Sequence, residues 1–207
     1  MTNTLYDAAA AIMTMGRLFE SRGWAPATAG NYSARIDDTR IAITASGVDK
    51  GALTADDILV VGIDGKLVAG EDRKPSAETL LHTRLYRDLP WIGAVLHTHS
   101  VASTTIAMIP PEPEELVFAN YEILKAFAGY DTHEATAVLP VLDNSQDMAA
   151  LADAAAAKLR ANPRAPGYLI RGHGLYTWGH DMASARRHVE ALEFLFGCEL
   201  ERKRIGR

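Results

Sequence analysis

Histidine is the residue type whose spacing in this sequence most clearly suggests chemistry. His97 and His99 end an apolar run, and because side chains alternate along a strand, both imidazoles would point to the same side. His173 lies between Gly172 and Gly174, in a backbone that leaves its ring free to point inward. Three imidazoles are a ligand set that catalytic zinc uses, although iron, cobalt and manganese also accept them. The alternative is that these histidines are structural or lie in solvent.

A second group of residues, rich in glycine and hydroxyl groups, could bind an anion. Backbone amides at a helix N-terminus, with hydroxyl and amide side chains, can hold a phosphate with little net positive charge. Each segment alone is also what an ordinary turn contains, so only their convergence in space would make a site. The segments are GNYS at 30–33, TASG at 44–47 followed by Lys50, and KPS at 74–76 before an expected helix.

Composition limits the classes of protein that need to be considered. The 207 residues fit one globular domain, with 48% hydrophobic and 23% charged residues. A net charge of −5 argues against a nucleic-acid binder, and the single cysteine, Cys198, excludes a disulfide framework and a cysteine-rich zinc fold. We expect a cytoplasmic protein without a membrane partner, since the sequence has no signal peptide and no apolar stretch near the roughly 20 residues that span a bilayer.

Hydrophobic periodicity predicts the elements that position these residues. The sum is a single domain over residues 1–207, an α/β sandwich with a mainly antiparallel sheet and helices on its faces. Strands are expected over 30–47, at a hairpin around Asp64–Gly65, over 91–100 before the histidine pair, and at 137–142 and 167–178. Helices are expected at 5–22, 76–89, 101–109, 122–127, 148–161 and 181–202.

Five motifs, in this order and spacing, resemble the class II (zinc-dependent) aldolase and adducin-head superfamily: GNYS, ITASGVDKG, KPSAE, HTHS and GHGLYTWG. The resemblance covers nearly the whole chain and implies an α/β/α sandwich, assembled as a ring-like homotetramer with the site near a subunit interface. It also implies a sugar-phosphate substrate, one Zn²⁺ held by His97, His99 and His173, and a phosphate surrounded by Asn31, Ser46, Gly47 and Ser76.

Within the superfamily, HTHSVAS, NYEILKAF and the full GHGLYTWG are most similar to the dehydratases of methionine salvage. This similarity implies a lyase that removes water from 5-methylthioribulose 1-phosphate. The superfamily's aldolases have an acid/base glutamate at the position of Glu78, whereas that of the dehydratases corresponds to Glu122, and this chain has both. Ala77 departs from the aldolase pattern, in which many members have a second serine.

Three hypotheses about the function therefore remain open. The first is the zinc-dependent dehydratase, and the second is a sugar-phosphate aldolase or 4-epimerase that uses the same metal and Glu78. The third is a non-catalytic scaffold like the adducin head, against which the three intact histidines argue. Spacing alone also allows Glu122 to be a solvated residue paired with Lys125, and Glu78 to be a carboxylate in the first turn of a helix.

Overall fold

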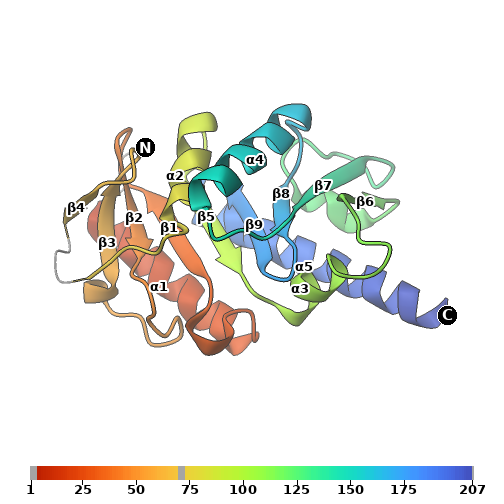
Figure 1. Ribbon diagram of the computed structural model, residues 1–207, viewed down its shortest axis with the longest axis horizontal. Helices are drawn as coiled ribbons and strands as arrows, with labels where there is room; N and C mark the ends of the chain where they lie inside the picture. The colour runs from red at the N-terminus through yellow and green to blue at the C-terminus, as the bar shows by residue number, and fades with distance from the viewer. Residues whose placement is uncertain (1–3, 70–72, 207) are drawn as a thin grey trace.

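One sheet runs through the molecule in the computed structural model, which describes residues 4–69 and 73–206 (Figure 1). Its strands are β1 (Asn31–Arg35), β2 (Arg40–Thr44), β3 (Ile58–Gly62), β4 (Leu67–Ala69), β5 (Ala94–Thr98), β6 (Glu115–Ala119), β7 (Thr136–Leu142), β8 (Gly167–Ile170) and β9 (Gly174–Gly179). The strand order is β4-β3-β2-β1-β5-β9-β8-β7-β6. Among the strands described, only β7 and β8 pair in parallel, so the prediction of a mainly antiparallel sheet is confirmed.

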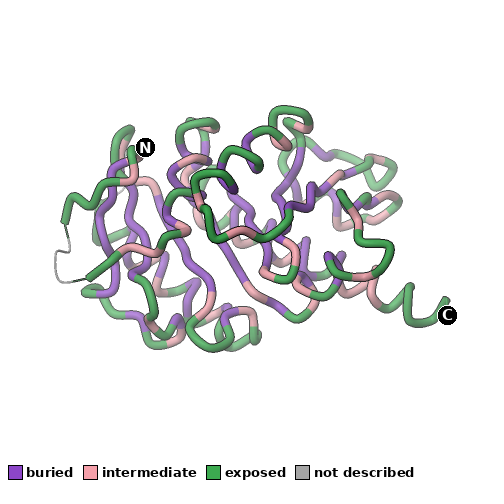
Figure 2. The backbone as a smooth tube through the Cα atoms, in the orientation of Figure 1, coloured by how far each residue is buried: buried purple, intermediate pink, exposed green. Residues whose placement is uncertain are grey.

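Helices cover both faces of this sheet and make three layers. They are α1 (Leu5–Ser21), α2 (Thr79–Asp88), α3 (Val101–Ile106), α4 (Met148–Ala161) and α5 (Met182–Ile205), with short 3₁₀ helices η1 (Pro26–Thr28), η2 (Ala55–Asp57) and η3 (Glu122–Ala126). Apolar side chains of α2 and α4 pack on one face, and those of α1, α3 and α5 on the other. Figure 2 shows the result, with buried strands between helices whose outer sides are exposed. No helix in the described part of the chain could cross a membrane.

Three elements differ from the sequence-based expectation. Helix α2 begins at Thr79 rather than Ser76, because the Ser76 hydroxyl accepts a hydrogen bond from the Glu78 amide (3.3 Å) in a turn before the helix. The segment expected as a helix at 122–127 is the 3₁₀ helix η3, and the preceding apolar stretch forms the edge strand β6. The turn before α2 places Glu78 at the N-cap of the helix, where the dipole favours a carboxylate.

Strand pairing brings distant segments together at the end of β5. Asn31 of β1 is opposite His97 of β5, and His97 is opposite Tyr176 of β9. Directly opposed residues in an antiparallel pair project to the same face, so these three side chains share the face that α2 covers. Gly174 allows β9 to approach this closely, because a Cβ there would lie 2.1 Å from the Thr98 carbonyl oxygen.

Candidate metal centre and substrate cavity

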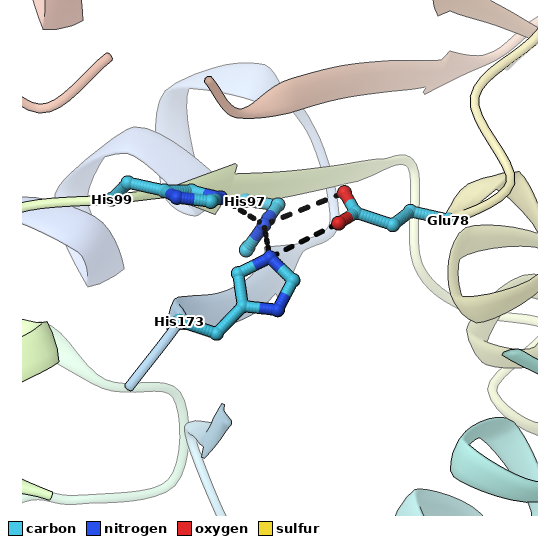
Figure 3. A group of neighbouring side chains, drawn as sticks. All are labelled: Glu78, His97, His99 and His173. Carbon is cyan, nitrogen blue, oxygen red and sulfur yellow. Dashed lines mark hydrogen bonds and ion pairs between the residues drawn. The ribbon is translucent and has the colours of Figure 1, made fainter. Parts of the chain in front are cut away.

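The three predicted histidine ligands meet at the end of β5 (Figure 3). His97 lies within β5, His99 follows its last residue, and His173 lies in the turn between β8 and β9. The His97 Nε2 atom is 2.8 Å from His99 Nε2 and 3.2 Å from His173 Nε2. The structure thus brings together two residues at the end of one strand and a third that is more than seventy residues away along the chain.

Glu78 completes the cluster from the start of α2. Its Oε1 atom lies 3.0 Å from His173 Nε2, and its Oε2 atom lies 3.5 Å from His97 Nε2, as the dashed lines of Figure 3 mark. Ligand atoms of all four residues lie within 4.8 Å of one another. Glu78 is therefore placed either to bind a metal ion or to act on a substrate beside it.

Hydrogen bonds behind the rings orient their free nitrogen atoms toward a common point. The Nδ1 atom of His97 lies 2.9 Å from the Leu175 carbonyl oxygen, and the Nδ1 atom of His173 lies 3.4 Å from Asn144 Oδ1. Both partners are acceptors, so each Nδ1 carries the proton and each Nε2 presents a lone pair.

These four residues fit a divalent cation. Burial lowers the pKa of His97 well below the usual value, and that of His99 to about 4, so the rings are neutral near pH 7. Neutral imidazole lone pairs and a carboxylate that face one another repel unless a cation lies between them. Four ligands at zinc-like bond lengths of about 2.0–2.1 Å would be roughly 3.3 Å apart, close to the separations seen here.

The Glu78 carboxylate is held ionised. Burial raises its pKa, but the hydrogen bonds that the carboxylate accepts, including one from the Asn31 amide, outweigh this effect, and the net pKa lies below the ordinary value. Asn31 Nδ2 donates a short hydrogen bond to Glu78 Oε2. A carboxylate that accepts such hydrogen bonds stays charged at neutral pH and fits a cation site.

A cavity of about 170 Å³ adjoins the metal cluster and gathers the residues expected around the phosphate. Its lining includes Asn31, Ser46, Gly47 and Ser76 together with Lys50, Glu78 and His99. The convergence that the sequence could not show is thus present. A larger, mainly apolar cavity of about 510 Å³ by α2 and α4 contains none of the cluster residues, so the chemistry points to the smaller one.

Lys50 supports the wall of this cavity. Its Nζ atom donates hydrogen bonds of 2.7 Å to the carbonyl oxygens of Thr28 and Val48, and its side chain is buried. Burial lowers the pKa of Lys50. The hydrogen bond from Lys50 to Thr28 fixes the loop at 26–30, in which Ala27 and Thr28 adopt left-handed backbone conformations with φ of 51° and 66°. Such a conformation in non-glycine residues is costly and is typical of binding loops.

The structure does not place Glu122 in the metal cluster of its own chain. Glu122 begins η3 with its side chain 72% exposed, and its carboxylate pairs with Lys125 (2.6 Å) and lies 3.9 Å from His133. The spacing-based alternative for this residue, an ion pair with Lys125, is thus present. A role for Glu122 at a metal centre requires a second subunit.

His82 is the residue at this site that sequence analysis missed. No motif of the sequence points to it, yet it is fully buried and hydrogen-bonded to Asn31. The available signal was its position four residues after Glu78, which places both side chains on one face of α2.

Acid should destabilise this fold through its buried histidines. Burial lowers the pKa of His82 from 6.5 to about 3, and it also lowers that of His188. At a pH between the folded and unfolded pKa values of such a histidine, the unfolded chain binds a proton that the folded chain does not. The free energy of unfolding therefore falls as the pH drops below about 6.5. Each of these histidines contributes a loss of ~1.4 kcal/mol per pH unit. Urea denaturation of metal-free protein at pH 7.5 and pH 5 measures this. Burial also raises the pKa of Glu193 to about 7, which acts in the opposite direction over this pH range, so the comparison is made in a Glu193→Gln background. Equal free energies of unfolding there would contradict the prediction.

Comparisons with known proteins agree with this arrangement. The family described as Class II Aldolase and Adducin N-terminal domain matches residues 10–200. A methylthioribulose-1-phosphate dehydratase of Marinobacter nauticus is 52% identical over 97% of this chain and 96% of its own length. The protein with that name from Pseudomonas aeruginosa strain PAO1 is 53% identical over 92% of each chain.

Solved structures share the fold. A putative aldolase/epimerase/decarboxylase, YgbL, from Klebsiella pneumoniae has a TM-score of 0.80 at 25% identity, covering 95% of this chain and 89% of its own. L-fuculose-1-phosphate aldolase from Thermus thermophilus has a TM-score of 0.76 at 26% identity, covering 98% and 97%. Sequence motifs, the architecture of the sheet and the histidine cluster lead to one conclusion: the chain belongs to the class II aldolase and adducin family.

Proposed function

We propose that this chain is a zinc-dependent lyase that dehydrates 5-methylthioribulose 1-phosphate to 2,3-diketo-5-methylthiopentyl 1-phosphate, a step of methionine salvage. The observation that carries the proposal is the cluster of three histidines and Glu78 beside a cavity lined with phosphate-binding residue types. The names of relatives that are more than 50% identical over nearly the whole chain support this substrate.

The chain's own residues would bind and orient the substrate. The hydroxyl groups of Ser46 and Ser76 and the backbone at Gly47 hold the phosphate in the small cavity. This position directs the carbon chain of the sugar toward His97, His99 and His173. A zinc ion held there supplies Lewis-acid polarisation of the substrate's C2 carbonyl and C3 hydroxyl oxygens.

Dehydration needs a group that moves protons between C3 and C4. A carboxylate removes the C3 proton, the C4–O bond breaks, and the departing hydroxyl takes a proton to leave as water. The resulting enol then accepts a proton at C4 and releases the proton of its C3 hydroxyl, which gives the diketone. We assign the acid/base role to Glu122, which would act at the centre of a neighbouring subunit because its own chain exposes it away from the cluster. The proposed assembly is a homotetramer.

The proposed location is the cytoplasm. The free thiol of Cys198 fits a reducing compartment, where disulfides are rare.

The position of Glu78 favours a second candidate. Because Glu78 lies in the cluster itself, the same centre fits a sugar-phosphate aldolase or 4-epimerase with Glu78 as the acid/base. Such an aldolase breaks the C3–C4 bond instead of the C4–O bond, and an epimerase leaves the mass unchanged.

Product analysis distinguishes these functions. Zinc-loaded protein is incubated with 5-methylthioribulose 1-phosphate, and the phosphorylated species are followed by mass spectrometry. A metal-dependent product lighter by one water supports the dehydratase. A three-carbon phosphate and a short aldehyde would replace it with the aldolase, and an isomer of unchanged mass with the epimerase.

Substitutions in the small cavity should affect mainly substrate binding. Removing the Ser46 or Ser76 hydroxyl deletes a hydrogen bond to a charged phosphate, worth roughly 1.5–3 kcal/mol, so the KM of each alanine variant should rise about tenfold or more. The kcat should change much less, since the phosphate does not react. Ser145→Ala is the matched control, because the Ser145 hydroxyl accepts from the Asp147 amide outside the cavity. An unchanged KM in both cavity variants would contradict the assignment.

A further inference from the structure

A line of buried polar side chains lies behind Glu78, between α2 and β1. Glu78, His82 and Tyr86 recur every four residues and therefore share one face of α2. Asn31 and Ser33 are two residues apart on β1 and share the face of the sheet that α2 covers. His82 lies between the two β1 side chains and contacts both.

These side chains are connected by hydrogen bonds from Tyr86 to Glu78. The Tyr86 hydroxyl is 3.0 Å from Ser33 Oγ, and Ser33 Oγ is 2.7 Å from His82 Nδ1. The Nε2 atom of His82 is 2.5 Å from Asn31 Oδ1. Asn31 Nδ2 then donates to Glu78 Oε2. Every member except Glu78 is at least nine-tenths buried.

The direction of every bond in this chain is determined. The Glu78 carboxylate only accepts, so the Asn31 amide nitrogen faces it and the amide oxygen faces His82. The amide oxygen accepts from His82 Nε2, and because burial lowers the pKa of His82 to about 3, this is the ring's single proton. His82 Nδ1 therefore accepts from Ser33. The Ser33 hydroxyl is thereby used as a donor, and its oxygen accepts from Tyr86.

We propose that His82 is a positioning residue for the metal centre: it fixes the Asn31 amide, which fixes the Glu78 carboxylate that faces His97 and His173. All the donors point toward Glu78, and hydrogen bonds aligned in one direction strengthen one another. The inference rests on the proposed function only in taking the cluster to be a metal centre. His82 does not contact the substrate cavity, whose lining includes Asn31 and Glu78 but not His82.

A purely structural role for His82 is the alternative to test. A buried histidine whose two nitrogen atoms are both hydrogen-bonded could simply fill the space under α2. There its ring also packs edge-on against the Tyr176 ring, with the ring centroids 5.7 Å apart. In that case its replacement would lower stability without acting through Glu78. The two roles therefore differ in whether the effect of changing His82 depends on the presence of the Glu78 carboxylate.

A double-mutant cycle on zinc affinity makes this distinction. The dissociation constant for zinc is measured by chelator competition for the wild-type protein, His82→Phe, Glu78→Gln and the double variant. Partners behind a ligand typically change metal affinity 10–100-fold. We expect His82→Phe to weaken binding about tenfold in the wild-type background and less than twofold in the Glu78→Gln background. Equal weakening in both backgrounds, or none in either, would overturn the inference.

Conservative variants keep the test valid if His82→Phe folds poorly. His82→Gln can donate from its side-chain amide to Asn31 and should retain zinc affinity within about threefold of wild type. His188→Phe is the matched control, since it also removes a buried histidine but one bonded to the Trp178 carbonyl oxygen. It should lower stability and leave zinc affinity unchanged. Failure of His82→Gln to retain affinity in a folded protein would point to a packing role and overturn the inference.

A spectroscopic measurement tests the proposed bond direction independently of zinc. Correlation of ¹⁵N and ¹H signals in metal-free protein should show His82 as the neutral tautomer with its proton on Nε2. A proton on Nδ1 would reverse the chain and overturn the inference. Because neither readout uses turnover, a protein that binds zinc with this coupling but does not release water would disprove the proposed function alone.

Discussion

Replacing His97 with alanine is expected to remove bound zinc and to lower kcat about a thousandfold. His97 is fully buried and its Nε2 atom lies within 3.2 Å of the Nε2 atoms of His99 and His173, so the alanine variant loses the ligand at the middle of the cluster. Metal catalysis supplies several kcal/mol, and each 1.36 kcal/mol is a factor of ten in rate. Zinc content by elemental mass spectrometry and the rate of substrate dehydration measure the two effects.

The control for this prediction is His180→Ala. His180 is exposed and packs on the Trp91 ring, away from the cluster, so its variant should keep both zinc and turnover. A His97→Ala protein that retains one zinc per chain and normal turnover would show that the cluster is not the metal centre.

The second large effect is expected for Glu122→Gln. General acid–base groups contribute about 10²–10⁴-fold, and kcat should fall by this factor while zinc content stays the same. The fold should tolerate the change, because the side chain is exposed and its ion pair with Lys125 is worth little in water. Normal turnover in Glu122→Gln, with turnover lost in Glu78→Gln, would transfer the acid/base role to Glu78.

Mixed assemblies test whether Glu122 acts across subunits. His97→Ala and Glu122→Gln proteins should each be inactive alone. When they are unfolded and reassembled together, a site can combine the intact His97 of one subunit with the intact Glu122 of its neighbour. Random mixing of equal amounts in a ring would restore about a quarter of the sites. No recovery in assemblies shown to contain both variants would contradict action in trans.

The local parts of this site could be predicted from the sequence. Alternation along a strand was enough to place His97 and His99 on one side of β5, and flanking glycines identified His173 as a residue free to turn inward. Hydrophobic periodicity predicted the strands and the helices that cover the sheet, because each element buries one face or stripe of its surface, and the short connections between the first strands predicted antiparallel pairing.

The remaining features depend on pairing between distant strands. The contact of Asn31 with Glu78 follows from the packing of α2 on β1, which no local pattern specifies. For the same reason no local pattern identifies His82, since its partners on β1 are about fifty residues away. The role proposed for Glu122 depends on a second chain, which the sequence of one subunit does not describe.

The most direct test of the account is to measure dehydration in the same preparation before and after removal of the metal. Wild-type and His97→Ala proteins are stripped with a chelator and then resupplied with zinc, and each is assayed with 5-methylthioribulose 1-phosphate for loss of one water. We predict that wild-type protein loses activity on stripping and regains it with zinc, while His97→Ala stays inactive throughout. Water loss by stripped protein or by His97→Ala would show that the reaction does not take place at this centre.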